Sequence, residues 1–120
     1  MRFILFIFSV CTLVTAQTPY EKGKELYLSK ACYSCHGHKL EGIHTYPYLA
    51  NRAKGFLSYK LHYFRSGKAD SQRQEMMIAY TKGLSDEDIE NLSIYMNEYQ
   101  ESDLEERYDD SYEVHGDGGS

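Results

Sequence analysis

The apolar side chains of this sequence repeat every three to four positions wherever a repeat can be recognised. In residues 53–66, Leu57, Leu61 and Phe64 recur at i, i+4 and i+7, and the segment ends at Ser66-Gly67. This spacing places the three side chains on one face of a helix. No segment alternates apolar and polar residues as a half-buried strand does. The pattern therefore predicts an all-α fold.

Two further helices are predicted from the residues at their first turns. Thr18 can cap a helix that has Pro19 at its first position and Glu21 three residues after the cap, so a helix begins at about Pro19 and runs to about Cys32. Ser85 precedes three acidic residues, which the positive end of a helix dipole stabilises. The last helix therefore begins there, and its apolar face consists of Ile89, Leu92, Tyr95, Met96 and Tyr99.

The connections between these helices lack a clear apolar period. Residues 37–47 are broken by two glycines and a proline and predict a loop. Residues 67–74 are polar and also predict a loop, and residues 76–82 predict a short turn that ends at Gly83. With three to four helices, the chain is expected to form one small domain.

The N-terminal residues 1–16 have the composition of an export signal. Arg2 is followed by an apolar run that is shorter than a membrane span and ends in Thr15-Ala16. Cleavage after Ala16 would remove Cys11 and leave a mature chain without a membrane span. The alternative at this stage is an uncleaved membrane anchor. We expect residues 17–100 to form an exported, periplasmic domain.

Charge separates the C-terminal segment from that domain. Residues 17–100 hold 11 basic and 10 acidic side chains, so they are nearly neutral and do not favour nucleic acid as a partner. Residues 101–120 hold eight acidic side chains against Arg107 alone. We expect this acidic tail to be disordered beyond about residue 108, because it has too few apolar side chains to offset the entropy of ordering.

The motif Cys32-Tyr33-Ser34-Cys35-His36 is the one candidate for chemistry. In C-x-x-C-H, the two thiols can add to the two vinyl groups of one porphyrin, and the histidine reaches the iron from the same side. A redox disulfide would be expected beside a βαβ pattern, which is missing. A zinc site would need a second pair of ligands at similar spacing. The motif therefore predicts one covalent haem c held by Cys32 and Cys35, with His36 as an axial ligand of the iron.

The second axial ligand decides between electron transfer and binding of small molecules. From the sequence alone, His38 is too close to His36, Met96 suits core packing, His62 lies in the middle of a helix and His115 in the tail. The pair Met76-Met77 remains, with His44 as the alternative if two histidines bind the iron.

Several segments together resemble the class I cytochrome c family, particularly its small bacterial monohaem members. The resemblance covers roughly residues 20–99. Its marks are Gly23 and Tyr27, Cys32 to Gly37, Pro47-Tyr48-Leu49-Ala50, Leu57-Ser58-Tyr59-Lys60-Leu61, Phe64-Arg65-Ser66-Gly67, Met76-Met77 and Leu84-Ser85-Asp86-Glu87-Asp88-Ile89.

The resemblance implies a cytochrome c fold and a set of contacts. Gly23 and Tyr27 would meet Leu92 and Tyr95 of the last helix. The Pro47 carbonyl would accept the ring N–H of His36. The axial methionine, seven residues before the Leu of Leu-Ser-Asp, would be Met77, and Met76 would serve packing. Tyr27 stands five residues before Cys32, where the family more often has four, which implies a bulge in residues 29–31.

The function that these inferences favour is transport of single electrons rather than enzymatic catalysis. The expected donor is a dehydrogenase or quinol complex and the expected acceptor an oxidase or peroxidase of a respiratory chain. The alternative is a haem subunit bound permanently to a periplasmic dehydrogenase. A haem enzyme or gas sensor is a third possibility and would need an open position on the iron.

Overall fold

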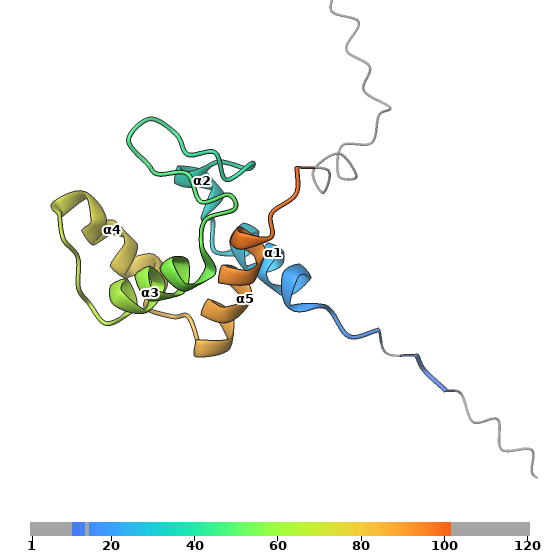
Figure 1. Ribbon diagram of the computed structural model, residues 1–120. Helices are drawn as coiled ribbons and strands as arrows, with labels where there is room; N and C mark the ends of the chain where they lie inside the picture. Colours follow the sequence, from blue (N-terminus) through green and yellow to red (C-terminus); the bar gives the residue numbers. More distant parts are fainter. Residues whose placement is uncertain (1–10, 14, 102–120) are drawn as a thin grey trace, which may run out of the picture.

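A computed structural model describes residues 11–13 and 15–101, and this part of the chain contains five helices and no strand (Figure 1). The all-α prediction is confirmed. One helix more than the expected three to four is present because α2 is a separate single turn of four residues. None of the helices in the described part is long and apolar enough to cross a membrane. The helices are α1 (Pro19–Ser29), α2 (Tyr33–His36), α3 (Lys54–Arg65), α4 (Gln72–Thr81) and α5 (Asp86–Asn97).

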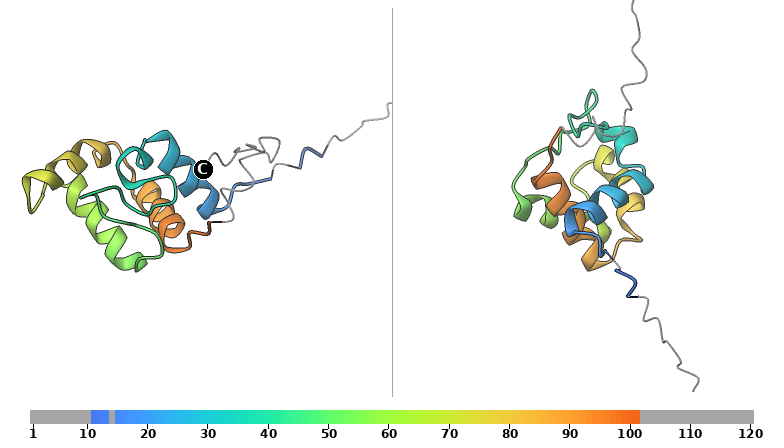
Figure 2. Two further views of the ribbon diagram at one scale, coloured as in Figure 1. Left: turned by 90° about the horizontal axis from the view of Figure 1, so that it is seen from above. Right: turned by 90° about the vertical axis from the view of Figure 1, so that its right-hand side faces the viewer.

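Helix α5 is the centre of the arrangement. It packs against α1 on one side and α3 on the other, and α4 packs against α3 (Figure 2). The core lies along these contacts, with Tyr27, Ile89, Leu92 and Tyr95 almost fully buried. The apolar face predicted for the last helix is therefore the face on which the other helices meet.

The crossing of α1 and α5 depends on Gly23. A Cβ atom there would lie 2.1 Å from the carbonyl oxygen of Asn91 and 2.7 Å from the Cβ of Tyr95, so a larger residue cannot fit without moving a helix. One turn further along α1, the ring of Tyr27 packs on that of Tyr95 with 5.6 Å between centroids. The contact expected between Gly23, Tyr27 and Tyr95 is confirmed, and Asn91 is a neighbour that the sequence did not reveal.

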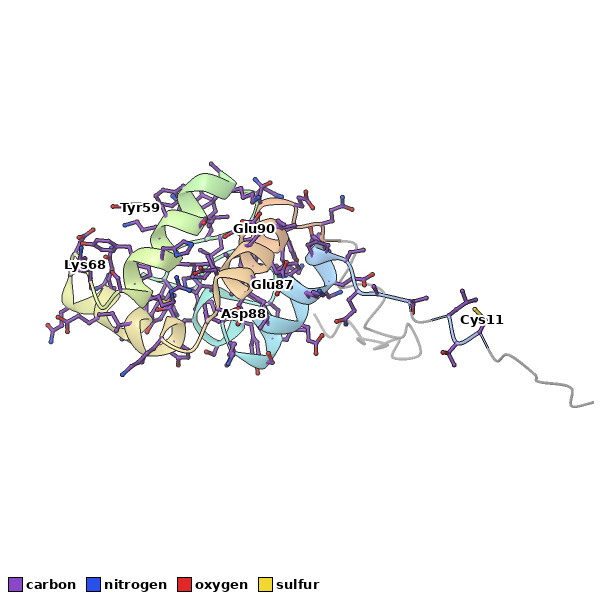
Figure 3. The ribbon with its side chains drawn as sticks, turned by 90° about the horizontal axis from the view of Figure 1, so that it is seen from below. Cys11, Tyr59, Lys68, Glu87, Asp88 and Glu90 are labelled. Carbon is purple, nitrogen blue, oxygen red and sulfur yellow. The ribbon has the colours of Figure 1, made fainter. Side chains whose placement is uncertain are left out.

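Both predicted N-cap residues are confirmed, and each forms a capping box. The Thr18 hydroxyl accepts the Glu21 N–H at 3.2 Å, and the Glu21 carboxylate accepts the Thr18 N–H at 3.3 Å. Ser85 and Asp88 exchange the same pair of hydrogen bonds, both at 3.0 Å. Figure 3 labels Glu87, Asp88 and Glu90 on α5, where the first turn carries three acidic residues.

The first helix ends earlier than expected, at Ser29, and the break has a defined geometry. Ala31 adopts a left-handed conformation with φ of 58°. The N–H of Ala31 donates to the Leu28 carbonyl and that of Cys32 to the Tyr27 carbonyl, at 3.2 and 3.0 Å. This pair of hydrogen bonds is the Schellman motif, which usually has glycine at the left-handed position. The irregularity expected in residues 29–31 is thus a helix stop rather than a bulge, and it places Cys32 directly after the turn.

The expectation of a loop to residue 74 and a short turn over residues 76–82 was wrong. Helix α4 begins at Gln72, and the hydroxyl of Ser71 caps it by accepting the N–H of Gln74 at 3.2 Å. The first turn of α4 is polar and exposed, so it shows no apolar period by which it could be recognised.

Candidate functional site

A cavity of about 440 Å³ opens between α2, α3, α4 and the loop that follows α2. Its volume lies in the range of ligand sites in proteins. Most of the wall is apolar, because the core faces of α3 and α5 border it. The apolar side chains on the wall include Leu49, Leu57, Leu61, Phe64, Leu92 and Met96.

Both thiols of the C-x-x-C-H motif lie on this wall. Cys32 and Cys35 are half-buried and not joined in a disulfide. Burial raises the pKa of Cys32 to about 11, so its thiol stays protonated at neutral pH. Cys32 is the N-cap residue of α2 and Cys35 is the third residue of that helix. Because α2 is a single turn, both cysteines lie on the wall of the same cavity.

His36 is buried beside the thiols and has a fixed orientation. Its Nδ1 atom lies 2.8 Å from the Pro47 carbonyl oxygen. Because a carbonyl can only accept, Nδ1 is the donor, and Nε2 is left with its lone pair. Burial lowers the pKa of His36, which favours the neutral ring. The predicted contact between His36 and Pro47 is confirmed, and an imidazole in this state is the form that ligates iron.

The loop after α2 is tied to the motif by backbone contacts. The Gly42 N–H donates to the His36 carbonyl at 2.8 Å. The Tyr27 hydroxyl donates to the Gly37 carbonyl at 2.6 Å, and burial shifts the pKa of this phenol upward. Gly37 and Gly42 have φ of 86° and 78°, which a side chain would strain. These contacts hold the loop, and with it Pro47, against α2.

The two methionines of α4 differ in their surroundings, although both lie on the cavity wall. Met77 is half-buried and packs on the core, whereas Met76 is 47% exposed. The side chain of Met76 lies on the cavity wall, and the packing role expected for it stays a prediction. Met96 also borders the cavity but is buried in the core, as predicted.

None of the other described histidines lies on the cavity wall. His38 is exposed and stacks on Tyr33 with 4.5 Å between ring centroids. His44 is exposed in the loop, and His62 is exposed on α3, where it lies 3.0 Å from the Arg65 guanidinium. His115 lies outside the described residues, as do most of the export segment and nearly all of the acidic tail. Of the candidate axial ligands, the fold brings Met76, Met77 and Met96 to the same cavity as His36, and Met96 among them is buried in the core.

Three basic side chains lie on the cavity wall. They are Arg52, Lys60 and Arg73, which come from the loop, α3 and α4. No local motif marks them, because their place at the cavity depends on how the helices pack.

The residues that line the cavity suit haem chemically. The cavity is largely apolar, and a single turn supplies two thiols and one neutral imidazole on the same wall. Among the described residues, no three His, Cys, Asp or Glu side chains gather as they would around a bare metal ion. The donor set therefore suits a covalently attached porphyrin better than zinc.

Comparison with known proteins agrees with this assignment. The family profile described as cytochrome c matches residues 20–100. Cytochrome c-554(547) of Halothiobacillus neapolitanus is 33% identical over 82 residues, which are 62% of this chain and 89% of that protein. Cytochrome c-554(548) of Halomonas halodenitrificans is 31% identical over 65 residues, 53% of this chain and 78% of that protein. The chain belongs to the cytochrome c family, and its cofactor is covalently attached haem c.

Proposed function

We propose that this electron-transfer protein is a periplasmic carrier whose haem is attached at Cys32 and Cys35 and whose iron is ligated by His36 and Met77. The observation that carries the proposal is the hydrogen bond from His36 Nδ1 to the Pro47 carbonyl at 2.8 Å. It fixes the tautomer with a free lone pair on Nε2, beside the two thiols. Met77 borders the same cavity from α4.

The residues of the chain have separate tasks in this proposal. Bound haem c supplies an iron that alternates between the ferrous and ferric states. The thiols hold it covalently, and the Pro47 carbonyl keeps the His36 ring in one orientation. The apolar wall excludes water, which would otherwise compete for the iron. A thioether of Met77 would complete the coordination and leave no open position for a substrate, as electron transfer requires.

Attachment is tested by mass and extraction. The mass of the mature protein should exceed that of its chain by one haem, and acidified organic solvent should leave the colour on the protein. Cys32→Ala or Cys35→Ala should lower the yield of holoprotein, and His36→Ala should leave little folded protein, because haem would form much of so small a core. Haem that extracts freely would contradict attachment at these cysteines.

The periplasmic role follows from residues 1–16 and is tested by fractionation. The mature chain should begin at Gln17 and be found in the periplasm. A monomer that exchanges electrons with a dehydrogenase or quinol complex and with an oxidase or peroxidase would be a mobile carrier. Copurification with a large dehydrogenase at high salt would instead identify a permanent haem subunit.

The acidic tail of residues 101–120 is proposed to keep the protein soluble. Its first residue, Glu101, pairs with Lys39 at 2.8 Å. Deleting the tail should leave the spectrum and the reduction potential unchanged. Electron-transfer rates measured across ionic strength with the native partner decide whether it has a further role: a changed salt dependence would show that the tail takes part in docking.

A further inference from the structure

Helix α4, which carries Met77, is anchored differently at its two ends. It lies at the edge of the helix arrangement and packs against α3 (Figure 1). Near its C-terminal end, Thr81 and Leu84 are buried, and the Thr81 hydroxyl donates to the Met77 carbonyl at 2.9 Å. The first turn is polar instead, and Gln72 and Arg73 in it are exposed. The start of α4 therefore depends on polar contacts to stay against α3.

Asp70, just before the capping residue of α4, provides these contacts. One oxygen of its carboxylate accepts a hydrogen bond from the Tyr63 hydroxyl at 2.6 Å, and the other lies 3.8 Å from the Lys60 ammonium. Its backbone N–H donates to the side-chain carbonyl of Gln74 at 3.0 Å. In the described part of the chain, no other side-chain hydrogen bond or ion pair links α3 to the first turn of α4. Asp70 thus joins the two helices at this end.

The Tyr63 side chain is well placed for its part in this link. Its ring lies edge-on to that of Phe64, with 6.1 Å between centroids, and Phe64 borders the haem cavity. The hydrogen bond to Asp70 raises the pKa of Tyr63, so the phenol keeps its proton and remains a donor at neutral pH. Gln74, on the other side of the link, also borders the cavity. The contacts of Asp70 therefore connect two parts of the wall on which Met77 lies.

We propose that Asp70 is a positioning residue, which holds the first turn of α4 against α3 and thereby keeps the Met77 thioether at the iron. The inference rests on the proposed ligation by Met77 and goes beyond it, because it assigns the residue that maintains the ligand. Hydrogen bonds to a charged group are stronger than those between neutral groups. Without the link, the start of α4 should leave α3 more often while the buried Thr81 end stays in place, and Met77 would move away from the iron with it.

The test measures how often Met77 leaves the iron in purified ferric holoprotein. Added imidazole binds the iron only after the thioether has left, so the binding rate at saturating imidazole is the rate of opening. Asp70→Ala should raise this rate by about three- to tenfold, as expected for the loss of one exposed, charge-assisted hydrogen bond. Hydrogen exchange of the backbone amides in the first turns of α4 should accelerate by a similar factor.

Two further variants show whether the effect comes from the contact between Asp70 and Tyr63. Tyr63→Phe removes the hydroxyl and should also accelerate opening. Combining it with Asp70→Ala should add little to the effect of Asp70→Ala alone, because both changes break the same hydrogen bond. If the two effects multiplied in full, Asp70 would not act through Tyr63, and the inference would fail.

Asp86→Ala is the matched control. Asp86 also accepts a hydrogen bond from a side chain of α3, that of Arg65, but it stands at the start of α5. This variant should leave the imidazole rate and the exchange of the α4 amides unchanged. An equal rise in Asp86→Ala, or no rise in Asp70→Ala, would overturn the inference. If wild-type protein lacks the red absorption of thioether-bound ferric iron, the proposed ligation by Met77 fails instead, and the α4 amides decide separately whether Asp70 holds the helix.

Discussion

Asn51 and Asn97 join the cavity loop to the end of α5. The Asn51 side-chain amide donates to the carbonyl oxygens of Asn97 and Tyr99, at 3.0 and 2.9 Å, and its backbone N–H donates to that of Met96 at 2.8 Å. In return, the Asn97 amide donates to the Arg52 carbonyl. Asn51 thus provides the terminal carbonyls of α5 with donors that the helix itself lacks.

Removing the Asn51 side chain should therefore weaken the fold. Asn51→Gly tolerates the left-handed backbone, φ of 58°, and loses two hydrogen bonds, so the free energy of unfolding should fall by about 1–3 kcal/mol. Unfolding of the holoprotein in guanidinium chloride measures this change in the free energy of unfolding. Asn51→Ala should be less stable still, because alanine also strains this backbone. Wild-type stability in Asn51→Gly would show that these hydrogen bonds contribute nothing net.

The crossing of α1 and α5 provides a second prediction. Gly23→Ala should lower the free energy of unfolding by about 1–3 kcal/mol or more, because its Cβ would collide with the backbone of Asn91. Gly55→Ala is the control, since a Cβ there meets nothing within 4 Å, and it should be neutral or stabilising. Thermal unfolding of both variants checks this, and similar losses in the two would be evidence against a specific contact at Gly23.

At the end of α1, the left-handed Ala31 should make glycine the better residue. Ala31→Gly removes strain and should raise the free energy of unfolding by about 0.5–1 kcal/mol. Ala79→Gly, in the exposed interior of α4, should lower it by about 1 kcal/mol. Opposite signs for the same chemical change are the expected result, and a loss of stability in both variants would contradict the Schellman geometry.

A pH effect is expected where α3 ends and α5 begins. Arg65 donates a hydrogen bond to the Asp86 carboxylate at 2.5 Å, which lowers the pKa of Asp86. The pair therefore stabilises the fold above the ordinary aspartate value of 3.8, and this contribution is lost as the pH falls through the lowered pKa. In an NMR titration, Arg65→Gln should raise the pKa of Asp86. Arg73→Gln, at a position without this contact, should leave it unchanged.

The proposed axial ligand is tested by a pair of neighbouring variants. Met77→Ala should abolish the weak red absorption of ferric iron bound to a thioether and should lower the potential, whereas Met76→Ala should do neither. The reverse result would assign the ligand to Met76. If neither variant changes the spectrum, ligation by two histidines, with His44 as the partner, becomes the better interpretation. Ferrous wild-type protein should not bind carbon monoxide, since binding would indicate an open position.

Local signals in the sequence predicted much of this fold. Capping residues marked the starts of α1 and α5, and apolar spacing marked α3, because these patterns depend only on neighbours along the chain. The start of α4 was missed, since Ser71 was its only signal. The hydrogen bonds of Asn51 could not be predicted, because they depend on how distant segments pack. The motif identified the thiols and His36, and the family resemblance supplied the contact to Pro47.

The cavity wall begins at Ala31 and ends at Met96, and α1 meets α5 close to the two ends of the folded chain. Contacts so far apart in sequence have a large cost in loop-closure entropy and form slowly. A chain made from its N-terminus therefore presents Cys32, Cys35 and His36 long before α5 exists. Docking of α5 is therefore the folding step expected to complete the cavity wall around these three residues.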